Sequence, residues 1–311
     1  MTEARRDLPA RIGIATLNIL APGVGLLRLG QWRLAAMFLA VPIAAWLFGI
    51  FLFAMLPELS FGGLLILAGF LYLVGLGAII GAVAMTWTRS AWRRQPLAGY
   101  GRWYIIVALI VALIVGYIVA GNLLVGAAHR FYKPFYTPSE AMAPTLLKND
   151  HIVASMRAPS TFRRGEVILF WVGPNVYIKR IAALPGDRIA LRNGIVVLNG
   201  GVVPQRYERE EPNISKGGPP TARRLREAFP GERGSHEIYD SETVREDDYP
   251  ETLVAPGHLF VLGDNRDNSA DSRVPRLEGG VEQLPISDIV GRALYYTYGP
   301  SHRSGQRINP E

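Results

Sequence analysis

The stretch "WYIIVALIVALIVGYIVAGNLLVGAA" (residues 103–128) divides this 311-residue chain into two halves of different character. It contains no charged side chain, and a helix of about 20 apolar residues crosses the ~30 Å hydrocarbon layer of a membrane. Two earlier stretches, near 34–56 and 62–88, are also long and apolar enough to do so. Residues 1–130 are therefore predicted to be a multi-pass membrane anchor with three spans.

The formal charge of +7 lies entirely in this apolar half. Residues 1–130 contain ten arginines, no lysine and three acidic residues, whereas basic and acidic residues balance in 131–311. A nucleic-acid-binding protein needs a basic patch on a folded, soluble face, so no nucleic acid partner is expected. The chain has no cysteine, which excludes disulfides, zinc–thiolate sites and a cysteine nucleophile.

The arginines predict how the anchor is oriented. They cluster at 5, 6 and 11, at 28 and 33, and at 89, 93, 94 and 102, while the loop "PELSF" (57–61) has none. The positive-inside rule puts all three clusters in the cytoplasm if the short segment 12–27, broken by "APGVG", is re-entrant or interfacial. The chain after His129 is then periplasmic or extracellular, on a protein of the cell (inner, cytoplasmic) membrane. Four full spans would instead place the second half in the cytoplasm.

Residues 131–311 are predicted to form a mostly-β domain. Short runs such as "EVILFWV" and "HLFVLG" are rich in residues that favour strands, and "RNGIVVLNGG" contains two Asn-Gly pairs typical of tight hairpin turns. A weak helical period occurs around "TARRLREAF" (221–229), where a short helix is the one helical element considered in this half. A polar insertion, about 204–255, is expected to be a smaller subdomain or a loop. The five histidines are scattered and are expected at surfaces or interfaces, so no metal and no cofactor is predicted.

Lys179 is unusual among the four lysines because it interrupts an apolar strand, "VYIKRI" (176–181). Alternation along a strand puts Lys179 on the face of Tyr177 and Ile181, with Arg180 on the other face. Burial would lower the pKa of this amine and make it a candidate general base. The alternative is a lysine at a sheet edge that extends to water, which periodicity alone favours.

Two further stretches combine turn residues with reactive or charged side chains. "TPSEAMAPTLL" (137–147) follows the last apolar segment and holds short side chains between two prolines, as expected of a fixed bend. "GDNRDNSADSR" (263–273) follows an apolar strand and is too polar to be expected in the core. It is predicted to be a turn held by hydrogen bonds, or else a solvated loop with weak ion pairs.

Together these stretches resemble type I signal peptidases. The family has a Pro-Ser-x-Ser-Met-x-Pro-Thr-Leu segment after its membrane anchor, a Tyr-x-Lys-Arg strand leading to Leu-Pro-Gly-Asp, and a Gly-Asp-Asn-Arg-Asp-Asn-Ser-x-Asp-Ser-Arg loop. Here they read "PSEAMAPTL" (138–146), "YIKRIAALPGD" (177–187) and "GDNRDNSADSR" (263–273), and "RRGEVILF" (163–170) looks like a further block of the family. They occur in the family's order and frame nearly all of 131–311.

The resemblance implies a helical membrane anchor joined to a mostly-β, signal-peptidase-type catalytic domain with a smaller inserted subdomain. It implies a Ser/Lys endopeptidase that removes signal peptides from secreted preproteins after small residues, of the Ala-x-Ala type. Its partners would be preprotein signal peptides and the lipid bilayer, with the translocation machinery a candidate for the extra membrane segments.

The resemblance also assigns roles to residues. Lys179 matches the general base, Ser269 the serine that orients it, and Ser139 the serine that completes the oxyanion hole with the backbone N–H of residue 141. Further matches brace the site or belong to its motif: Arg180, Asp264, Asp271, Arg273, Pro138, Met142 and Pro144.

The position of the nucleophile is held by Ala141, where the family has serine. Alanine has no atom that can attack, so the chain is predicted to bind signal peptides without cleaving them. Ser139 lies two residues earlier, about 6–7 Å away along an extended backbone, and is not expected to substitute. Two explanations stay open: an engineered inactivation, or a natural pseudoprotease that binds signal peptides or regulates an active relative.

Overall fold

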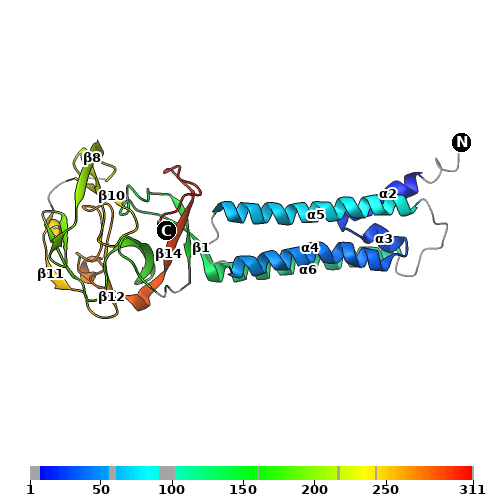
Figure 1. Ribbon diagram of the computed structural model, residues 1–311, viewed down its shortest axis with the longest axis horizontal. Helices are drawn as coiled ribbons and strands as arrows, with labels where there is room; N and C mark the ends of the chain where they lie inside the picture. The colour runs from blue at the N-terminus through cyan, green and yellow to red at the C-terminus, as the bar shows by residue number, and fades with distance from the viewer. Residues whose placement is uncertain are drawn as a thin grey trace. The chain divides into compact units, whose positions relative to one another are not determined.

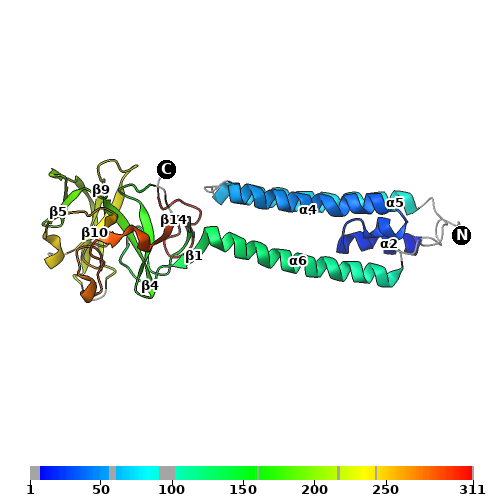
Figure 2. The same ribbon diagram turned by 90° about the horizontal axis from the view of Figure 1, so that it is seen from below.

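The computed structural model describes residues 8–55, 61–90, 102–157, 159, 161–215, 218–241 and 244–309. The arginines at 5, 6, 93 and 94 and most of the "PELSF" loop lie outside these residues. The chain divides into two compact units, Met1–Ala128 and His129–Glu311, which Figures 1 and 2 show from two sides. Each unit is described by itself.

The first unit is helical. Its helices are α2 (Leu8–Leu20), α3 (Val24–Arg28), α4 (Trp32–Met55), α5 (Phe61–Ser90) and α6 (Trp103–Phe131). In both views the short helices α2 and α3 lie beside one end of the long helices (Figures 1 and 2). α2 packs against α5, and α3 packs against both α4 and α5. The segment 12–27 is thus two short helices and a turn, which is shorter than a straight span requires.

A buried asparagine holds this turn. Asn18 is fully buried, and its Oδ1 accepts hydrogen bonds from the backbone N–H groups of Gly23 (2.9 Å) and Gly25 (3.0 Å). Its Nδ2 donates to Oγ1 of Thr86 on α5 at 2.9 Å. The side chain therefore satisfies N–H groups that the break between α2 and α3 leaves without helical partners.

Within the described residues, two helices are long and apolar enough to cross a membrane. The apolar windows are Trp32–Gly49 in α4 and Ile66–Thr88 in α5. They coincide with the first two predicted spans. α6 covers the third predicted span, 103–128, whose crossing of the membrane stays a prediction.

The second unit is built on antiparallel sheets, as predicted. The strands of its seven-stranded sheet, in order across it, are β1 (Tyr132–Tyr136), β2 (His151–Ser155), β14 (Ile289–Tyr298), β3 (Val167–Val172), β4 (Asn175–Ala183), β12 (His258–Leu262) and β13 (Leu284–Pro285). Beside β12, β4 is paired only from Arg180 onward, so that edge of Asn175–Lys179 is not covered by β12.

Two smaller sheets complete the unit. A four-stranded sheet has the order β11 (Tyr249–Leu253), β5 (Arg188–Arg192), β6 (Ile195–Leu198) and β7 (Gly201–Val202). A three-stranded sheet within the polar insertion has the order β10 (His236–Asp240), β9 (Thr221–Glu227) and β8 (Gln205–Pro212). Single 3-10 turns lie between strands at η2 (Arg245–Asp247), η3 (Arg276–Glu278) and η4 (Ile286–Asp288). Only 205–240 of the insertion forms its own sheet, because β11 pairs with β5.

Local sequence explains part of this arrangement. Asn193, Gly194, Asn199 and Gly200 all have positive φ and form the turns that join β5, β6 and β7, which confirms the two predicted hairpin turns. The suggested helix at 221–229 is wrong, because Thr221–Glu227 is strand β9. Its arginines pair with glutamates of β8 and β10, and these neighbours override the weak helical period.

Candidate active site

The segment 137–147 is a bend fixed at both ends. The backbone N–H of Thr137 donates to the carbonyl of Asp150 at 2.9 Å, and the N–H of Leu147 donates to Oδ2 of Asp150 at 2.8 Å. Between them, Met142 and Leu146 are buried in a cluster with Leu169 of β3. Ser139 stays exposed and Ala141 is half-buried. The buried side chains anchor the bend, so residues 139–141 face solvent from a defined position.

The "GDNRDNSADSR" loop, 263–273, is called the acidic loop below. The expectation that it lies outside the core is wrong, because six of its residues are almost fully buried: Asp264, Asn265, Arg266, Asp271, Ser272 and Arg273. Each of these side chains has at least one hydrogen-bond or ion-pair partner inside the protein, which is the condition for burying it. The predicted turn held by hydrogen bonds is confirmed, for example by Asn268 N–H to the Asn265 carbonyl at 3.1 Å.

The bend and the acidic loop are in direct contact. The carbonyl of Ala141 accepts from the backbone N–H of Asn265 at 3.2 Å, and the carbonyl of Glu140 accepts from Asn265 Nδ2, also at 3.2 Å. A Cβ placed on Gly263 would lie 2.0 Å from Ser269 Oγ and 2.6 Å from the Ala141 carbonyl oxygen. Only glycine at 263 allows so close an approach.

Lys179 lies on β4 opposite Ile168 of β3 and is only 4% exposed. Although β12 does not cover the strand edge at Lys179, the side chain is buried, so the alternative of a lysine that extends to water is wrong. Burial lowers the pKa of Lys179 to about 8, and the negative charges of Asp271 and Asp264 offset part of this effect. Its amine thus becomes neutral at a lower pH than a free lysine does, with half of the molecules neutral near pH 8.

Asp271 is held by Arg273 in a two-point ion pair. Arg273 Nε donates to Oδ1 of Asp271 at 2.9 Å and its terminal nitrogen to Oδ2 at 2.9 Å, while the Gly263 N–H also donates to Oδ2 at 2.9 Å. Burial alone would raise the pKa of Asp271, but the charge and hydrogen bonds of Arg273 hold it below the ordinary value. Asp271 is therefore a carboxylate close enough to Lys179 to affect its charge.

Asp264 and Arg180 form a second buried ion pair. Arg180 Nε donates to Oδ1 of Asp264 at 2.8 Å, another guanidinium nitrogen donates to the carbonyl of Gly165 at 2.6 Å, and Thr145 donates to Oδ2 of Asp264. Burial would raise the pKa of Asp264, yet the charge of Arg180 keeps it below its ordinary value. The pair ties β4 to both the bend and the acidic loop.

Ser269 lies beside these groups, on the acidic loop. Its Oγ is buried and, within the residues that the structure describes, accepts and donates no hydrogen bond. The orientation of Lys179 by this hydroxyl therefore stays a prediction.

A groove of about 810 Å³ brings the predicted site residues together. β1 and the bend contribute to its lining, with Ser139 and Ala141, and so does β4, with Ile178 and Lys179. Ala270 of the acidic loop also lines it. The other predicted site residues are not among the residues that line it: Pro144, Arg180, Asp264, Ser269, Asp271 and Arg273. Its lining is mainly apolar and includes Asn175–Lys179, the part of β4 that β12 does not cover.

Sequence reasoning missed several groups around the site. Thr145 belongs to the quoted motif, but its partner Asp264 is 119 residues away. His236 was expected at a surface and is instead buried between Glu227 and Glu232. No local pattern marks such a pair, because the partners meet only in the folded chain. Among the described residues, no group of three His, Cys, Asp or Glu side chains is arranged to hold a metal ion.

Comparisons with known proteins agree with this geometry. The model of a family described as "Signal peptidase, peptidase S26" matches residues 102–298. "Probable signal peptidase I-1" of Synechocystis is 29% identical over 217 residues, which are 65% of this chain and 83% of that protein. "Signal peptidase I" of Pseudomonas aeruginosa is 30% identical over 224 residues, 65% of this chain and 72% of that protein. "Signal peptidase I U" of Bacillus subtilis is 29% identical over 175 residues, 54% of this chain and 78% of that protein. The family match covers more than half of the chain, from the start of α6 to the end of β14, and the chain therefore belongs to the S26 family of signal peptidases, serine endopeptidases that remove signal peptides.

Proposed function

We propose that this chain binds the signal peptides of secreted preproteins in the groove between β1 and β4 and, with alanine at position 141, does not cleave them. The observation that carries the proposal is that Ala141 and Lys179 line the same groove. Lys179 has the burial and the lowered pKa of a general base, but residue 141 offers no hydroxyl proton for it to accept.

The remaining groups support acyl-transfer chemistry at this point. The exposed Ser139 hydroxyl and the backbone N–H of residue 141 would stabilise the oxyanion, as donors do in related Ser–Lys sites. Asp264, Asp271, Arg180 and Arg273 would hold the surrounding backbone, and Ser269 would orient Lys179. In subtilisin, a serine protease with a comparable dependence on its nucleophile, loss of that serine alone costs on the order of 10⁶ in kcat.

The groove suits an extended peptide with small side chains at the cleavage site. The uncovered edge of β4 offers backbone groups for pairing with a strand, which is a common mode of peptide recognition. Met142 and Ile178 line the groove together with Lys179, and their apolar side chains would favour small apolar side chains of the peptide there. This supports preference for Ala-x-Ala sites.

The decisive experiment compares the chain and its Ala141→Ser variant in detergent, using a preprotein with an Ala-x-Ala site. We expect cleavage only by the variant, and loss of that cleavage when Lys179→Met is added. Cleavage by the unchanged chain would contradict the assignment of residue 141. If neither protein cleaves but both bind the peptide, the second candidate function, a signal-peptide-binding pseudoprotease, is favoured.

We further propose that α4, α5 and α6 cross the cell membrane, that α2 and α3 form a re-entrant hairpin, and that the β unit faces the periplasm or exterior. Arg11 of α2 donates to the Trp87 carbonyl of α5 at 3.1 Å, so the start of α2 and the end of α5 lie together. Arg28 and Arg33 flank the short turn between α3 and α4. The arginines thus gather where the positive-inside rule expects a cytoplasmic face.

Because the chain has no cysteine, single cysteines can report this topology. In intact cells, an impermeant thiol reagent should label Ser287→Cys in the β unit and leave Gln31→Cys, between α3 and α4, unlabelled. The reverse pattern would support four full spans and a cytoplasmic β unit.

A further inference from the structure

The inserted sheet β8–β10 contacts the acidic loop at its backbone. The N–H of Tyr239 on β10 donates to the carbonyl of Asp264 at 2.8 Å, and the N–H of Arg266 donates to the carbonyl of Tyr239 at 2.9 Å. This is a parallel bridge between β10 and the acidic loop around Asn265. The insertion is therefore hydrogen-bonded, backbone to backbone, to the loop that carries Ser269 and Asp271.

A buried charge cluster makes a second connection. Arg266 of the acidic loop donates to both carboxylate oxygens of Glu227 on β9, and the two side chains are 2% and 0% exposed. His236 lies between Glu227 (3.2 Å) and Glu232 (2.9 Å), and Gln205 donates to Glu227 at 2.9 Å. Burial would raise the pKa of Glu227, but the charge of Arg266 and the hydrogen bond of His236 hold it far below the ordinary value.

The segment between β8 and β9 makes a third connection to the acidic loop. Oγ of Ser215 accepts from Asn265 Nδ2 at 3.0 Å and from Asn268 Nδ2 at 3.1 Å. Asn265 also holds the Ala141 and Glu140 carbonyls, and Asn268 lines the groove. The insertion thus reaches the rim of the groove.

Inside the acidic loop, a chain of hydrogen bonds connects Arg266 to Asp271, whose charge acts on Lys179. The carbonyl of Arg266 accepts from Arg273 at 2.5 Å, and Arg273 in turn holds Asp271. Asp271 is the charged group with the largest effect on the pKa of Lys179.

On the insertion, alternation along β9 puts Arg224 and Arg226 on the face opposite Glu227.

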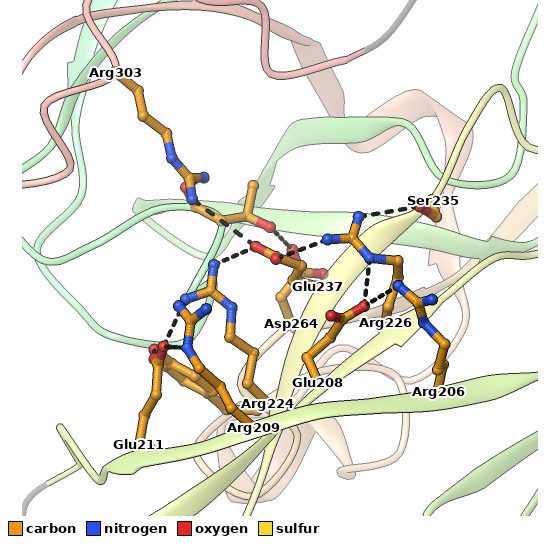
Figure 3. A network of polar contacts seen from close by, with 12 residues as sticks. Arg206, Glu208, Arg209, Glu211, Arg224, Arg226, Ser235, Glu237, Asp264 and Arg303 are labelled. Atoms are coloured by element: carbon orange, nitrogen blue, oxygen red, sulfur yellow. Dashed lines mark hydrogen bonds and ion pairs between the residues drawn. The ribbon is translucent and has the colours of Figure 1, made fainter.

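Figure 3 shows the ion pairs of that opposite face. Arg224 and Arg226 each contact Glu237 of β10, and they also contact Glu211 and Glu208 of β8 respectively. These pairs join the three strands of the insertion to one another. A displacement of β10 or β9 relative to β8 would therefore have to break them.

We infer that the β8–β10 sheet is a positioning element for the catalytic site, in which Glu227, Arg266 and Ser215 hold the acidic loop against Lys179 and the bend at residue 141. These are positioning residues, since none of them lines the groove with Lys179. The inference rests on the proposed function, because it assigns the insertion a role in the same site.

The test measures Lys179 directly and needs no cleavage. The full chain in detergent is labelled with trace acetic anhydride at a series of pH values, and each lysine is quantified by mass spectrometry. The chain has only four lysines, and the exposed Lys133 and Lys148 serve as references in the same sample. In the unchanged chain the reactivity of Lys179 should reach half its maximum near pH 8.

In Glu227→Gln the acidic loop loses the charge that holds Arg266, and water gains access to Lys179. A looser loop would also carry Asp271 away from Lys179, which by itself lowers the pKa, but desolvation is the larger cause of the present value, so we expect the midpoint to move upward by about one pH unit. Glu210 is an exposed residue of β8 whose side chain accepts a hydrogen bond from Thr221, so Glu210→Gln is the matched control and should leave the midpoint unchanged. An unchanged midpoint in a folded Glu227→Gln protein would overturn the inference.

If Glu227→Gln does not fold, the Ser215→Ala variant tests the positioning role instead. Removing this hydroxyl should speed amide hydrogen exchange in the peptide containing 263–273 several-fold, whereas Ser235→Ala, at the exposed turn between β9 and β10, should not. Equal exchange in the two variants would contradict the inference. Within the Ala141→Ser protein, Glu227→Gln should lower kcat about tenfold with little change in KM. If Ala141→Ser alone fails to cleave, the proposed function is contradicted. The labelling and hydrogen-exchange results test the positioning role of the β8–β10 sheet separately, because they do not depend on cleavage.

Discussion

The carbonyl oxygen of Ala141 accepts a hydrogen bond from the backbone N–H of Asn265, with 3.2 Å between oxygen and nitrogen. This bond joins the bend that carries residue 141 to the acidic loop that carries Ser269 and Asp271. Both partners are backbone groups, so a change of side chain at 141 leaves the bond in place. Ala141→Ser is therefore expected to add a hydroxyl without moving the loop.

The pH dependence of the Ala141→Ser variant should report Lys179. A general base must be neutral to accept a proton, and Lys179 is protonated below a pKa of about 8. We expect kcat/KM for a preprotein to rise with pH through about 8 and then level off. A rate that is constant from about pH 6 to about pH 10 would mean that another group acts as the base.

Replacing Lys179 by methionine should stabilise the unchanged chain at neutral pH. The folded protein binds this proton more weakly than the unfolded chain, since the pKa falls from 10.5 to about 8. At about 1.4 kcal/mol per pH unit, the buried charge costs about 3 kcal/mol below pH 8.

This cost should disappear as the pH rises from about 8 to 10.5, where both states become neutral. Chemical unfolding followed by circular dichroism at a series of pH values would show it. Lys148→Met, at an exposed position, should change the free energy of unfolding little at any of them. A Lys179→Met protein less stable than the parent at neutral pH would contradict the expectation.

Asp264→Asn should destabilise the β unit strongly. It leaves the guanidinium of Arg180, which is 3% exposed, without its opposite charge, and breaking a buried ion pair in this way costs about 3–5 kcal/mol. Asp288→Asn removes the carboxylate of an exposed pair with Arg276, and should cost less than about 1 kcal/mol. Similar unfolding curves for the two variants would rule out this role for the buried pair.

The same carboxylate predicts acid sensitivity. The pKa of Asp264 is lowered in the folded protein, so its contribution to stability is complete above its unfolded value and is lost as the pH falls through the folded one. The difference in stability between the parent and Asp264→Asn should therefore shrink below about pH 4.

Asn18→Leu should destabilise the helical unit. It leaves the buried N–H groups of Gly23 and Gly25 without an acceptor, at a cost of about 1–3 kcal/mol for each group. Asn122 of α6 is exposed and its side chain donates to the carbonyl of Ile118 in its own helix, so Asn122→Leu is the matched control. Thermal unfolding in detergent should show a lower Tm for Asn18→Leu alone. An equal Tm would mean that the turn between α2 and α3 does not depend on Asn18.

Much of this protein could be predicted from local sequence. The apolar run 103–128 separates a helical half from a β half, because side-chain polarity alone decides what each segment can bury. The Asn-Gly turns at 193 and 199 follow from the conformational freedom of those residues. The face of β4 that carries Lys179 follows from strand alternation, and the motif around Ala141 indicates the family.

Only the tertiary structure decided how deeply these residues are buried and which charges surround them. Periodicity could not tell a buried Lys179 from one at a sheet edge, because burial depends on strands and loops far away in the chain. The acidic loop looked too polar for the core, yet the charges of Arg180 and Glu227 and the backbone of Tyr239, all from other segments, neutralise and bond it there. β9 is a strand because its arginines meet glutamates of β8 and β10. Charge compensation between remote segments has no local signature, and it is what makes a polar loop stable beside a buried lysine.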